Sequence, residues 1–200
     1  MNKILNLFLK LHKQSIYLPY SDKKVFPMII KLMADEFRNK KITKVVGIES
    51  RGFILAGGVA KELNCGLVMI RKSGNIEKID YKPRFKVIKK DFKDYSGTKK
   101  SLEVENDPLA FSKKDNYLVV DDWIATGSQI RAVVEIIESI KKGRIKGISV
   151  ILNSLPENFQ SMNEFDFLNR YSFKSLIRYN PYQLEEIENE SFFKNFFKKF

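Results

Sequence analysis

The sequence predicts an α/β protein with a doubly wound, mostly parallel sheet flanked by helices. Two patterns lead to this fold class. Short apolar, β-branched runs with little polar alternation are typical of strands buried on both faces, and four occur, at 44–49, 66–71, 117–121 and 147–152. Segments with apolar residues at helical spacing follow the first and third of these runs, at 52–63 and 129–141. A length of 200 residues with 44% hydrophobic content suits one domain over residues 1–200.

The first 43 residues are expected to be helical. Within residues 1–14, Phe8 and His12 share one helical face with two leucines, which predicts a short helix that packs on the core. This histidine is not expected to be catalytic. From residue 22 to residue 40, apolar side chains recur at helical spacing, and Pro27 is tolerated in the first turn of the amphipathic helix that this spacing predicts.

A long basic connection interrupts the alternation of strands and helices. Residues 73–108 contain only short extended candidates, at 85–88 and 101–105, and residues 71–100 carry a net charge of +7. Connections of this length in a compact domain are usually functional lids or disordered segments. We therefore predict a flexible hood at 73–108.

The C-terminal residues 180–200 are expected to form a tail helix. In SFFKNFFKKF, residues 191–200, the phenylalanines fall on one helical face and the lysines fall elsewhere. A basic aromatic helix can bind a membrane surface. Docking on the same chain or across a dimer is favoured, because the acidic run at 185–190 would repel anionic lipid.

Composition excludes several classes of function. The chain has 36 Lys and Arg against 24 Asp and Glu, a net charge of +12 that favours an anionic partner. One cysteine, Cys65, and one histidine exclude an intrachain disulfide, a thiolate zinc site and a two-histidine metal motif. No apolar run approaches the roughly 18 residues that a membrane span needs, and the N-terminus lacks the pattern of a signal peptide. We expect a cytoplasmic protein and no membrane partner.

The segment with the clearest chemistry is residues 117–131, YLVVDDWIATGSQIR. A buried strand ends in Asp121 and Asp122, and a turn of small residues then leads into a helix. Backbone N–H groups and two hydroxyls in that turn form a cradle for an anion. The residues of the cradle are Ala125, Thr126, Gly127, Ser128 and Gln129. The carboxylates can accept hydrogen bonds from sugar hydroxyls or hold Mg²⁺ through water, so the segment predicts a ribose phosphate site.

These residues resemble a known family. VVDDWIATGSQ resembles the phosphoribosyl pyrophosphate motif of type I phosphoribosyltransferases. Residues 45–58, VVGIESRGFILAGG, and 67–74, LVMIRKSG, resemble the adenine branch of that family, as do residues 153–155 and 173–179. The resemblance covers roughly residues 45–179 and implies the type I phosphoribosyltransferase fold.

The resemblance also implies a reaction. The 5-phosphoribosyl group of phosphoribosyl pyrophosphate would pass to a purine base, with Mg²⁺ as cofactor and pyrophosphate as the leaving group. Asp121 and Asp122 would hold the ribose hydroxyls, and would contact the metal only through substrate or water. The residues implied for pyrophosphate are Glu49, Ser50, Arg51, Gly52, Arg71 and Lys72. Arg51 would also be catalytic, because a guanidinium stabilises the charge that develops on the leaving oxygen.

The hood and the N-terminal region would complete the site. Closure of the hood would exclude water from the reacting centre. Asp94, in KDYSG at 93–97, is the carboxylate in the hood that best fits the family's pattern, and it is the candidate catalytic residue for the proton of the base. Tyr17, in IYLPYS at 16–21, is the candidate base-pocket residue.

The resemblance favours adenine as the base, AMP as the product, purine salvage as the role and a homodimer as the assembly. Two alternatives stay open. One is a 6-oxopurine phosphoribosyltransferase that uses hypoxanthine, guanine or xanthine, because Ser128 and Gln129 stand where the family has glycine and threonine and because the hood is long. The other is a phosphoribosyl pyrophosphate-binding regulator without catalysis. No helix-turn-helix pattern occurs and Arg51 is retained, which argues against a nucleic-acid-binding regulator.

Overall fold

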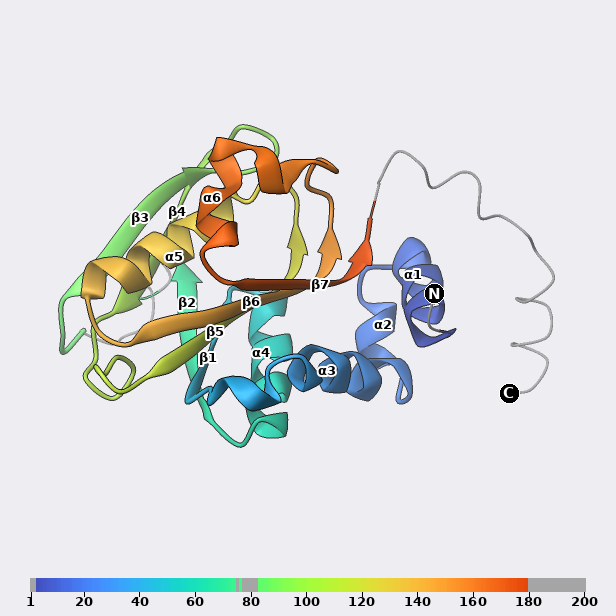
Figure 1. Ribbon diagram of the computed structural model, residues 1–200, viewed down its shortest axis with the longest axis horizontal. Coiled ribbons are helices and arrows are strands. Elements are labelled where there is room, and N and C mark those ends of the chain that lie inside the picture. Colours follow the sequence, from blue (N-terminus) through green and yellow to red (C-terminus); the bar gives the residue numbers. More distant parts are fainter. Residues whose placement is uncertain (1–2, 75, 77–82, 180–200) are drawn as a thin grey trace.

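A seven-stranded sheet lies at the centre of the molecule (Figure 1). The computed structural model describes residues 3–74, 76 and 83–179; the predicted tail helix and part of the predicted hood lie outside these residues. The spatial order of the strands is β3-β4-β2-β1-β5-β6-β7. Their bounds are β1 Lys44–Ile48, β2 Gly66–Lys72, β3 Val87–Lys93, β4 Lys99–Glu105, β5 Asn116–Ile124, β6 Arg144–Asn153 and β7 Ser172–Arg178.

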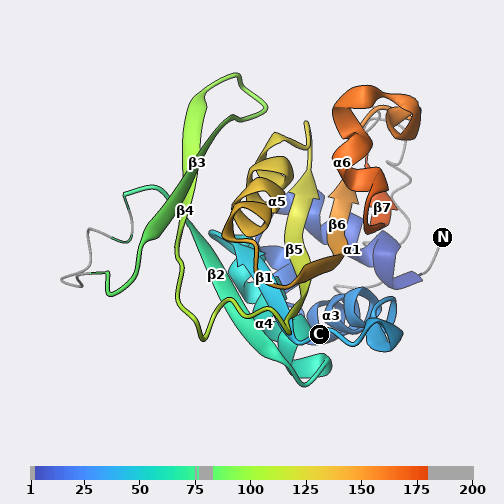
Figure 2. The same ribbon diagram turned by 60° about the vertical axis from the view of Figure 1, so that its left-hand side comes forward.

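Helices cover both faces of the sheet, as Figures 1 and 2 show. The bounds are α1 Lys3–Gln14, α2 Leu18–Ser21, α3 Val25–Asp35, α4 Arg51–Glu62, α5 Ser128–Ile140 and α6 Asp166–Asn169, with short 3₁₀ turns at Arg38–Lys40, Phe159–Ser161 and Asn163–Phe165. One apolar cluster joins α1, α3 and α4 to one face, and a second joins α5, α6 and the hairpin to the other. The predicted doubly wound α/β fold is confirmed.

The strand order defines where a ligand can bind. Strands β2, β1, β5, β6 and β7 are parallel, and the chain leaves β1 for α4 on one face but leaves β5 for α5 on the other. The topological switch point therefore lies between β1 and β5. In open α/β sheets the crevice at this point, beyond the carboxyl ends of the strands, binds ligands.

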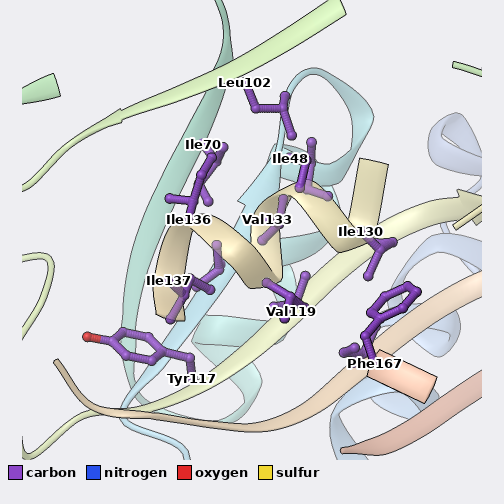
Figure 3. Packing of buried hydrophobic residues seen from close by; sticks show 14 of the residues in the cluster. Ile48, Ile70, Leu102, Tyr117, Val119, Ile130, Val133, Ile136, Ile137 and Phe167 are labelled. Atoms are coloured by element: carbon purple, nitrogen blue, oxygen red, sulfur yellow. The ribbon is translucent and has the colours of Figure 1, made fainter. Parts of the chain in front are cut away.

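The core under α5 fixes the direction of that helix (Figure 3). Apolar side chains on the inner face of α5 pack on alternate residues of the central strands, which are fully buried. The residues of this contact include Ile48, Ile70, Val119, Ile130, Val133, Ile136 and Ile137. In this layer the helical spacing of apolar residues marks the buried face of α5, and the apolar runs mark the buried strands. The predicted bounds of these elements therefore lie within a few residues of those found.

The predicted helix at 22–40 is shorter than expected. Asp22 Oδ1 accepts hydrogen bonds from the backbone N–H of Lys24 and of Val25, both at 2.8 Å, so the helix starts only at Val25. It ends at Asp35, and Phe37, which is fully buried, lies between the helix and the 3₁₀ turn at Arg38–Lys40. The apolar spacing of the sequence extended to Phe37 because this side chain is buried in the core although it lies beyond the end of the helix.

The described part of the predicted hood, residues 83–108, is a β-hairpin. Strands β3 and β4 pair antiparallel over seven residues each, and β4 joins the edge of the sheet through Leu102 and Glu103. Figure 2 shows the hairpin rising along the sheet edge beside α5. Ile88 and Phe92 of β3 pack against the core. The sequence analysis predicted only short extended pieces, because lysines around these two apolar residues hid the period-2 alternation.

A polar cluster ties the loop before β5 to β1, at the edge of the sheet opposite the switch point. The buried carboxylate of Asp115 accepts hydrogen bonds from Thr43 Oγ1 at 3.0 Å, Lys44 Nζ at 2.9 Å and Tyr117 Oη at 3.2 Å. It also accepts one from the backbone N–H of Ser112 at 2.8 Å. Side chains from two strands thus satisfy one buried charge.

Candidate active site

A cavity of about 380 Å³ opens at the switch point, between the ends of β1 and β5 and under the hairpin. It brings together most of the residues that the sequence analysis selected. Those that line it are Tyr17, Glu49, Ser50, Arg51, Lys72, Asp94, Asp121, Asp122, Ala125, Thr126, Gly127, Ser128 and Gln129. Gly52 and Arg71 are the two pyrophosphate candidates that do not line it.

The turn after β1 forms one side of the cavity. The peptide bond between Glu49 and Ser50 is cis, and Glu49 Oε2 accepts a hydrogen bond from the backbone N–H of Lys72 at 2.8 Å. The Nε of Arg71 is buried, makes no hydrogen bond within the described residues and lies 3.9 Å from Glu49 Oε2. Ion pairing and backbone contact therefore place Arg51, Arg71 and Lys72 at the same end of the site.

The two carboxylates at the end of β5 differ in their surroundings. Asp122 is partly exposed and pairs with Arg51, whose Nη2 lies 2.7 Å from Asp122 Oδ2. Asp121 is only 3% exposed, and its Oδ1 accepts a hydrogen bond from the backbone N–H of Asp122 at 3.0 Å. Asp122 is thus the more accessible carboxylate.

Asp121 is packed against the start of α4 and held by α5. A Cβ atom on Gly52 would lie 2.8 Å from Asp121 Oδ1, so the close approach of α4 requires glycine there. Gln129 Nε2 donates a hydrogen bond to Asp121 Oδ2 at 2.8 Å. Burial, together with the charge of Asp122, raises the pKa of Asp121 well above its usual range.

The anion cradle forms at the start of α5, where the chain turns at Gly127. Its φ of +76° lies in the left-handed region, which glycine adopts without steric conflict. The hydroxyls of Thr126 and Ser128 lie 2.9 Å apart and both line the cavity. The turn exposes backbone N–H groups at the positive end of a helix of 13 residues, an arrangement that suits a phosphate group.

The tip of the hairpin closes over the cradle. Ser128 Oγ donates a hydrogen bond to the carbonyl oxygen of Lys93 at 2.5 Å. Next to it, Asp94 Oδ1 accepts hydrogen bonds from the backbone N–H of Ser96 at 2.9 Å and of Thr98 at 3.0 Å, while Asp94 Oδ2 pairs with Lys100 at 2.6 Å. Hydrogen bonds from Lys100 and Ser96 hold the pKa of Asp94 well below its usual range.

Apolar and aromatic side chains form the remaining end of the cavity. They are Ile16, Tyr17, Phe92, Tyr95, Trp123 and Ile124. The rings of Tyr95 and Trp123 lie 5.6 Å apart, and Tyr17 and Tyr95 are 67% and 70% exposed. We call these six side chains the aromatic slot; their apolar and aromatic surfaces suit contact with a flat aromatic ligand.

The sequence analysis missed Trp123, Phe92, Tyr95 and Lys100 as cavity residues. A signal for Trp123 was available, because it directly follows the two carboxylates of the motif. The hairpin residues had none, since their approach to the cradle depends on tertiary packing of β3 against α5. His12 does not line the cavity; burial, followed by the charge of Arg51, lowers its pKa.

The acidic residues fit a magnesium ion only in combination with a substrate. Within the described ranges there is no group of three or more His, Cys, Asp or Glu side chains that could enclose a metal. Mg²⁺ is commonly held by one or two carboxylates together with phosphate oxygens and water. Of the two carboxylates in the motif, Asp122 is better placed to reach such an ion, because it is partly exposed whereas Asp121 is buried.

The sheet order, the cavity at its switch point and the glycine turn at α5 define a doubly wound α/β protein with a ligand-sized cavity at the carboxyl ends of its strands. Comparison with known proteins gives the family. A profile of the phosphoribosyl transferase domain matches residues 20–155. The chain belongs to this family.

Relatives within the family are adenine phosphoribosyltransferases. The protein from Citrifermentans bemidjiense is 39% identical over 119 residues, and the match covers 60% of this chain and 64% of the relative. That from Brachyspira hyodysenteriae is 30% identical over 158 residues, covering 79% of this chain and 84% of the relative. The chain thus spans less than two thirds of the first of these relatives and most of the second.

Solved structures show the same fold. Adenine phosphoribosyltransferase from Rhodothermus marinus superposes with a TM-score of 0.66 at 26% identity, covering 82% of this chain and 85% of that chain. The Giardia lamblia enzyme, complexed with 9-deazaadenine, gives a TM-score of 0.63 at 29% identity, covering 80% and 82%. Among the described residues no helix is both long and apolar enough to cross a bilayer.

Proposed function

We propose that the protein is a purine phosphoribosyltransferase that converts phosphoribosyl pyrophosphate and adenine into AMP and pyrophosphate, with a role in purine salvage. The single observation that carries the proposal is the cavity at the switch point, which joins an anion cradle, a carboxylate pair, a cationic end and an aromatic slot. These four parts match the 5′-phosphate, the ribose, the pyrophosphate and the base of the two substrates.

The cationic end would take the pyrophosphate. Arg51 and Lys72 line the cavity, and the buried Nε of Arg71 lies 3.9 Å from Oε2 of Glu49, which also lines it. As the bond from C1 of the ribose to the pyrophosphate oxygen breaks, the electron pair leaves with the oxygen, and the guanidinium of Arg51 would stabilise that charge. Glu49, Ser50 and Gly52 would shape this turn.

The cradle and the carboxylates would hold the sugar phosphate. The N–H groups and hydroxyls of residues 125–129 would bind the 5′-phosphate, and Asp122 would accept hydrogen bonds from ribose hydroxyls. Asp121 would support this contact through the hydrogen bonds that its carboxylate accepts from the backbone N–H of Asp122 and from Gln129 Nε2. Bound magnesium would supply positive charge that offsets the negative charge of the substrate oxygens.

The aromatic slot would hold the purine, with Tyr17 on the N-terminal side. The base nitrogen would attack C1 on the face opposite the leaving pyrophosphate, and its proton would then be lost. Asp94 is our candidate for handling that proton, since it lines the cavity in the hairpin. The alternative in which Asp94 only anchors the hairpin is tested below.

Two further features complete the proposal. We place the activity in the cytoplasm, since its phosphorylated substrates do not cross membranes freely. We also propose a homodimer, because Ile54 of α4 and Leu67 and Met69 of β2 are 42–52% exposed on neighbouring elements, and a second copy could cover them. The mass measured by light scattering would test this assembly.

The deciding experiment is turnover with each purine base. The protein is incubated with Mg²⁺, phosphoribosyl pyrophosphate and adenine, hypoxanthine, guanine or xanthine in turn, and nucleotide is measured. The proposal expects turnover with adenine. Turnover only with hypoxanthine, guanine or xanthine would show that the protein is a 6-oxopurine phosphoribosyltransferase. Tight binding of phosphoribosyl pyrophosphate without turnover would indicate a regulator.

A second test concerns the site. Replacing both carboxylates, as Asp121→Asn with Asp122→Asn, should lower affinity for phosphoribosyl pyrophosphate by orders of magnitude, because the diol loses the charged acceptor of Asp122 and the carboxylate that supports it. Calorimetric titration measures the change, and an unchanged affinity would overturn the placement of the ribose.

A further inference from the structure

A hydrogen-bonded relay behind the aromatic slot links three neighbouring strands. Trp123 Nε1 donates to Ser154 Oγ at 2.8 Å, and Ser154 Oγ donates to the carbonyl oxygen of Tyr179 at 2.7 Å. Trp123 lies near the end of β5, Ser154 directly follows β6, and Tyr179 directly follows β7. The relay therefore runs across the carboxyl edge of the sheet, where the cavity opens.

The direction of the relay is fixed by chemistry. An indole N–H can only donate and a carbonyl oxygen can only accept, so a single group between them must both accept and donate. A serine hydroxyl has one hydrogen and two lone pairs, and here it is used in both ways. No rotation of the Ser154 hydroxyl can reverse the order of donors and acceptors.

Backbone pairing holds the relay in place. The backbone N–H of Ser154 donates to the carbonyl of Ile124 at 2.9 Å, and that of Tyr179 donates to the carbonyl of Asn153 at 2.8 Å. Trp123 pairs in register with Leu152 on β6. The hydroxyl of Ser154 is thus attached to the same ladder that carries Trp123, and it has little freedom to move away from the indole.

Trp123 also has aromatic neighbours on two sides. The ring of Tyr179 meets it edge-on at 6.5 Å and 89°, and the ring of Tyr95 lies 5.6 Å away at 44°. Tyr95 lines the cavity on the hairpin, whereas Tyr179 does not line it. The relay and Tyr179 therefore hold the indole from the side away from the hairpin.

We infer that Ser154 is a positioning residue that fixes the plane of Trp123, so that the indole forms a rigid wall against the flat base. This inference rests on the proposed function and names a part of the site that neither the motif nor the cavity lining includes. A wall that is already fixed loses less conformational entropy when the ligand binds, which strengthens binding of a planar heteroaromatic ring.

The variants Ser154→Ala and Ser154→Thr separate the relay from general packing. Alanine removes both hydrogen bonds, whereas threonine keeps a hydroxyl that can accept and donate. We expect Ser154→Ala to raise the KM for the base and the Kd for AMP by about tenfold, with the Kd for phosphoribosyl pyrophosphate unchanged. Ser154→Thr should restore values near those of the wild type.

The chain contains one tryptophan, so its fluorescence reports on Trp123 alone. Ser154→Ala should change the emission maximum and lower the anisotropy of the unliganded protein, because the indole loses its hydrogen bond. Ser161→Ala is the matched control: Ser161 Oγ also donates to a backbone carbonyl, that of Asn158 at 2.8 Å, but lies outside the cavity lining. The control should leave emission and base binding unchanged.

A double-mutant cycle tests whether Ser154 acts through Trp123. Trp123→Phe keeps an aromatic ring but has no N–H to donate. If the role of Ser154 is to orient the indole, Ser154→Ala should have no further effect on the KM for the base in the Trp123→Phe background. Equal effects in both backgrounds would overturn the inference.

The remaining outcomes are distinguishable from failure of the proposed function. If the wild type forms AMP and Ser154→Ala alters emission without changing the KM for the base, the inference alone is overturned. If Ser154→Ala weakens binding of phosphoribosyl pyrophosphate as much as that of the base, its role is only structural and the inference is again overturned. If the wild type binds no purine and no phosphoribosyl pyrophosphate, the proposed function falls and the inference falls with it.

Discussion

Gln129 Nε2 donates a hydrogen bond to Asp121 Oδ2 at 2.8 Å, which joins the first turn of α5 to the end of β5. Gln129 stands where the family has threonine, and its side chain contacts a carboxylate of the motif. Gln129 also lines the cavity. This contact leaves Asp121 with protein donors on both oxygens, because the backbone N–H of Asp122 occupies the other.

Removing the amide of Gln129 should weaken the site. Gln129→Met keeps a side chain of similar length but leaves an oxygen of the buried Asp121 without its donor. We expect the affinity for phosphoribosyl pyrophosphate to fall by about tenfold, measured by calorimetric titration. Gln160→Met, at an exposed position in a 3₁₀ turn, is the control and should bind as the wild type does. Unchanged affinity in Gln129→Met would show that the contact has no part in binding.

Arg51 should act on the chemical step. Its guanidinium lies 2.7 Å from Asp122 and lines the cavity, at the end assigned to pyrophosphate. Arg51→Met should lower kcat by about 10²- to 10³-fold, with a small change in the KM for the base, because charge stabilisation is lost mainly in the transition state. Arg38→Met, which removes an exposed guanidinium paired with Asp35, is the control. Steady-state kinetics that show full kcat in Arg51→Met would exclude the assigned role.

Strands β1, β2, β5 and β6 and helices α4 and α5 could be predicted from the sequence because their apolar patterns reflect burial directly. The runs at 44–49 and 117–121 are buried on both faces, and the stripe containing Ile130, Val133 and Ile137 faces the sheet. The turn at Gly127 and the start of α5 also follow the pattern, since small residues lie between an apolar run and a helical stripe.

Contacts that depend on distant segments could not be predicted. The hairpin was hidden because Ile88 and Phe92 gain their burial only by packing on α5, 40 residues further on. The roles of Gln129 and Ser154 follow from which side chains the sheet brings side by side, and neither residue type indicates such a partner. The assignment of sites to residues stays a prediction that the variants test.

Asp94 can be assigned by comparing two variants. Its Oδ1 alone accepts the hydrogen bonds from Ser96 and Thr98, and an asparagine oxygen can take the same place without a charge. If Asp94 anchors the hairpin, Asp94→Asn should keep kcat within about threefold while Asp94→Ala lowers it by about tenfold or more. If Asp94 transfers the proton, both variants should lose activity alike. The lowered pKa of Asp94 favours the anchor, and kinetics with adenine decide between the two.

Asp115 should stabilise the fold most at neutral pH. Burial raises its pKa, but hydrogen bonds from Lys44 and Thr43 outweigh this, so the pKa lies below its ordinary value of 3.8. A carboxylate with a lowered pKa stabilises the native state above the ordinary value, and that contribution is lost as the pH falls through the lowered pKa. Asp115→Asn should therefore lower the free energy of unfolding at pH 7 by about 1 to 3 kcal/mol.

The loss in Asp115→Asn should shrink as the pH falls below 3.8, because the unfolded wild type then takes up a proton that the folded carboxylate still resists, and it should reach its minimum below the lowered pKa of the folded state. Urea unfolding at a series of pH values measures the difference. Asp35→Asn is the control, because Asp35 pairs only with the exposed side chains of Lys31 and Arg38, and exposed pairs contribute little. A difference between wild type and Asp115→Asn that stays constant from pH 7 to pH 3 would show that packing, and not the charge of Asp115, is responsible.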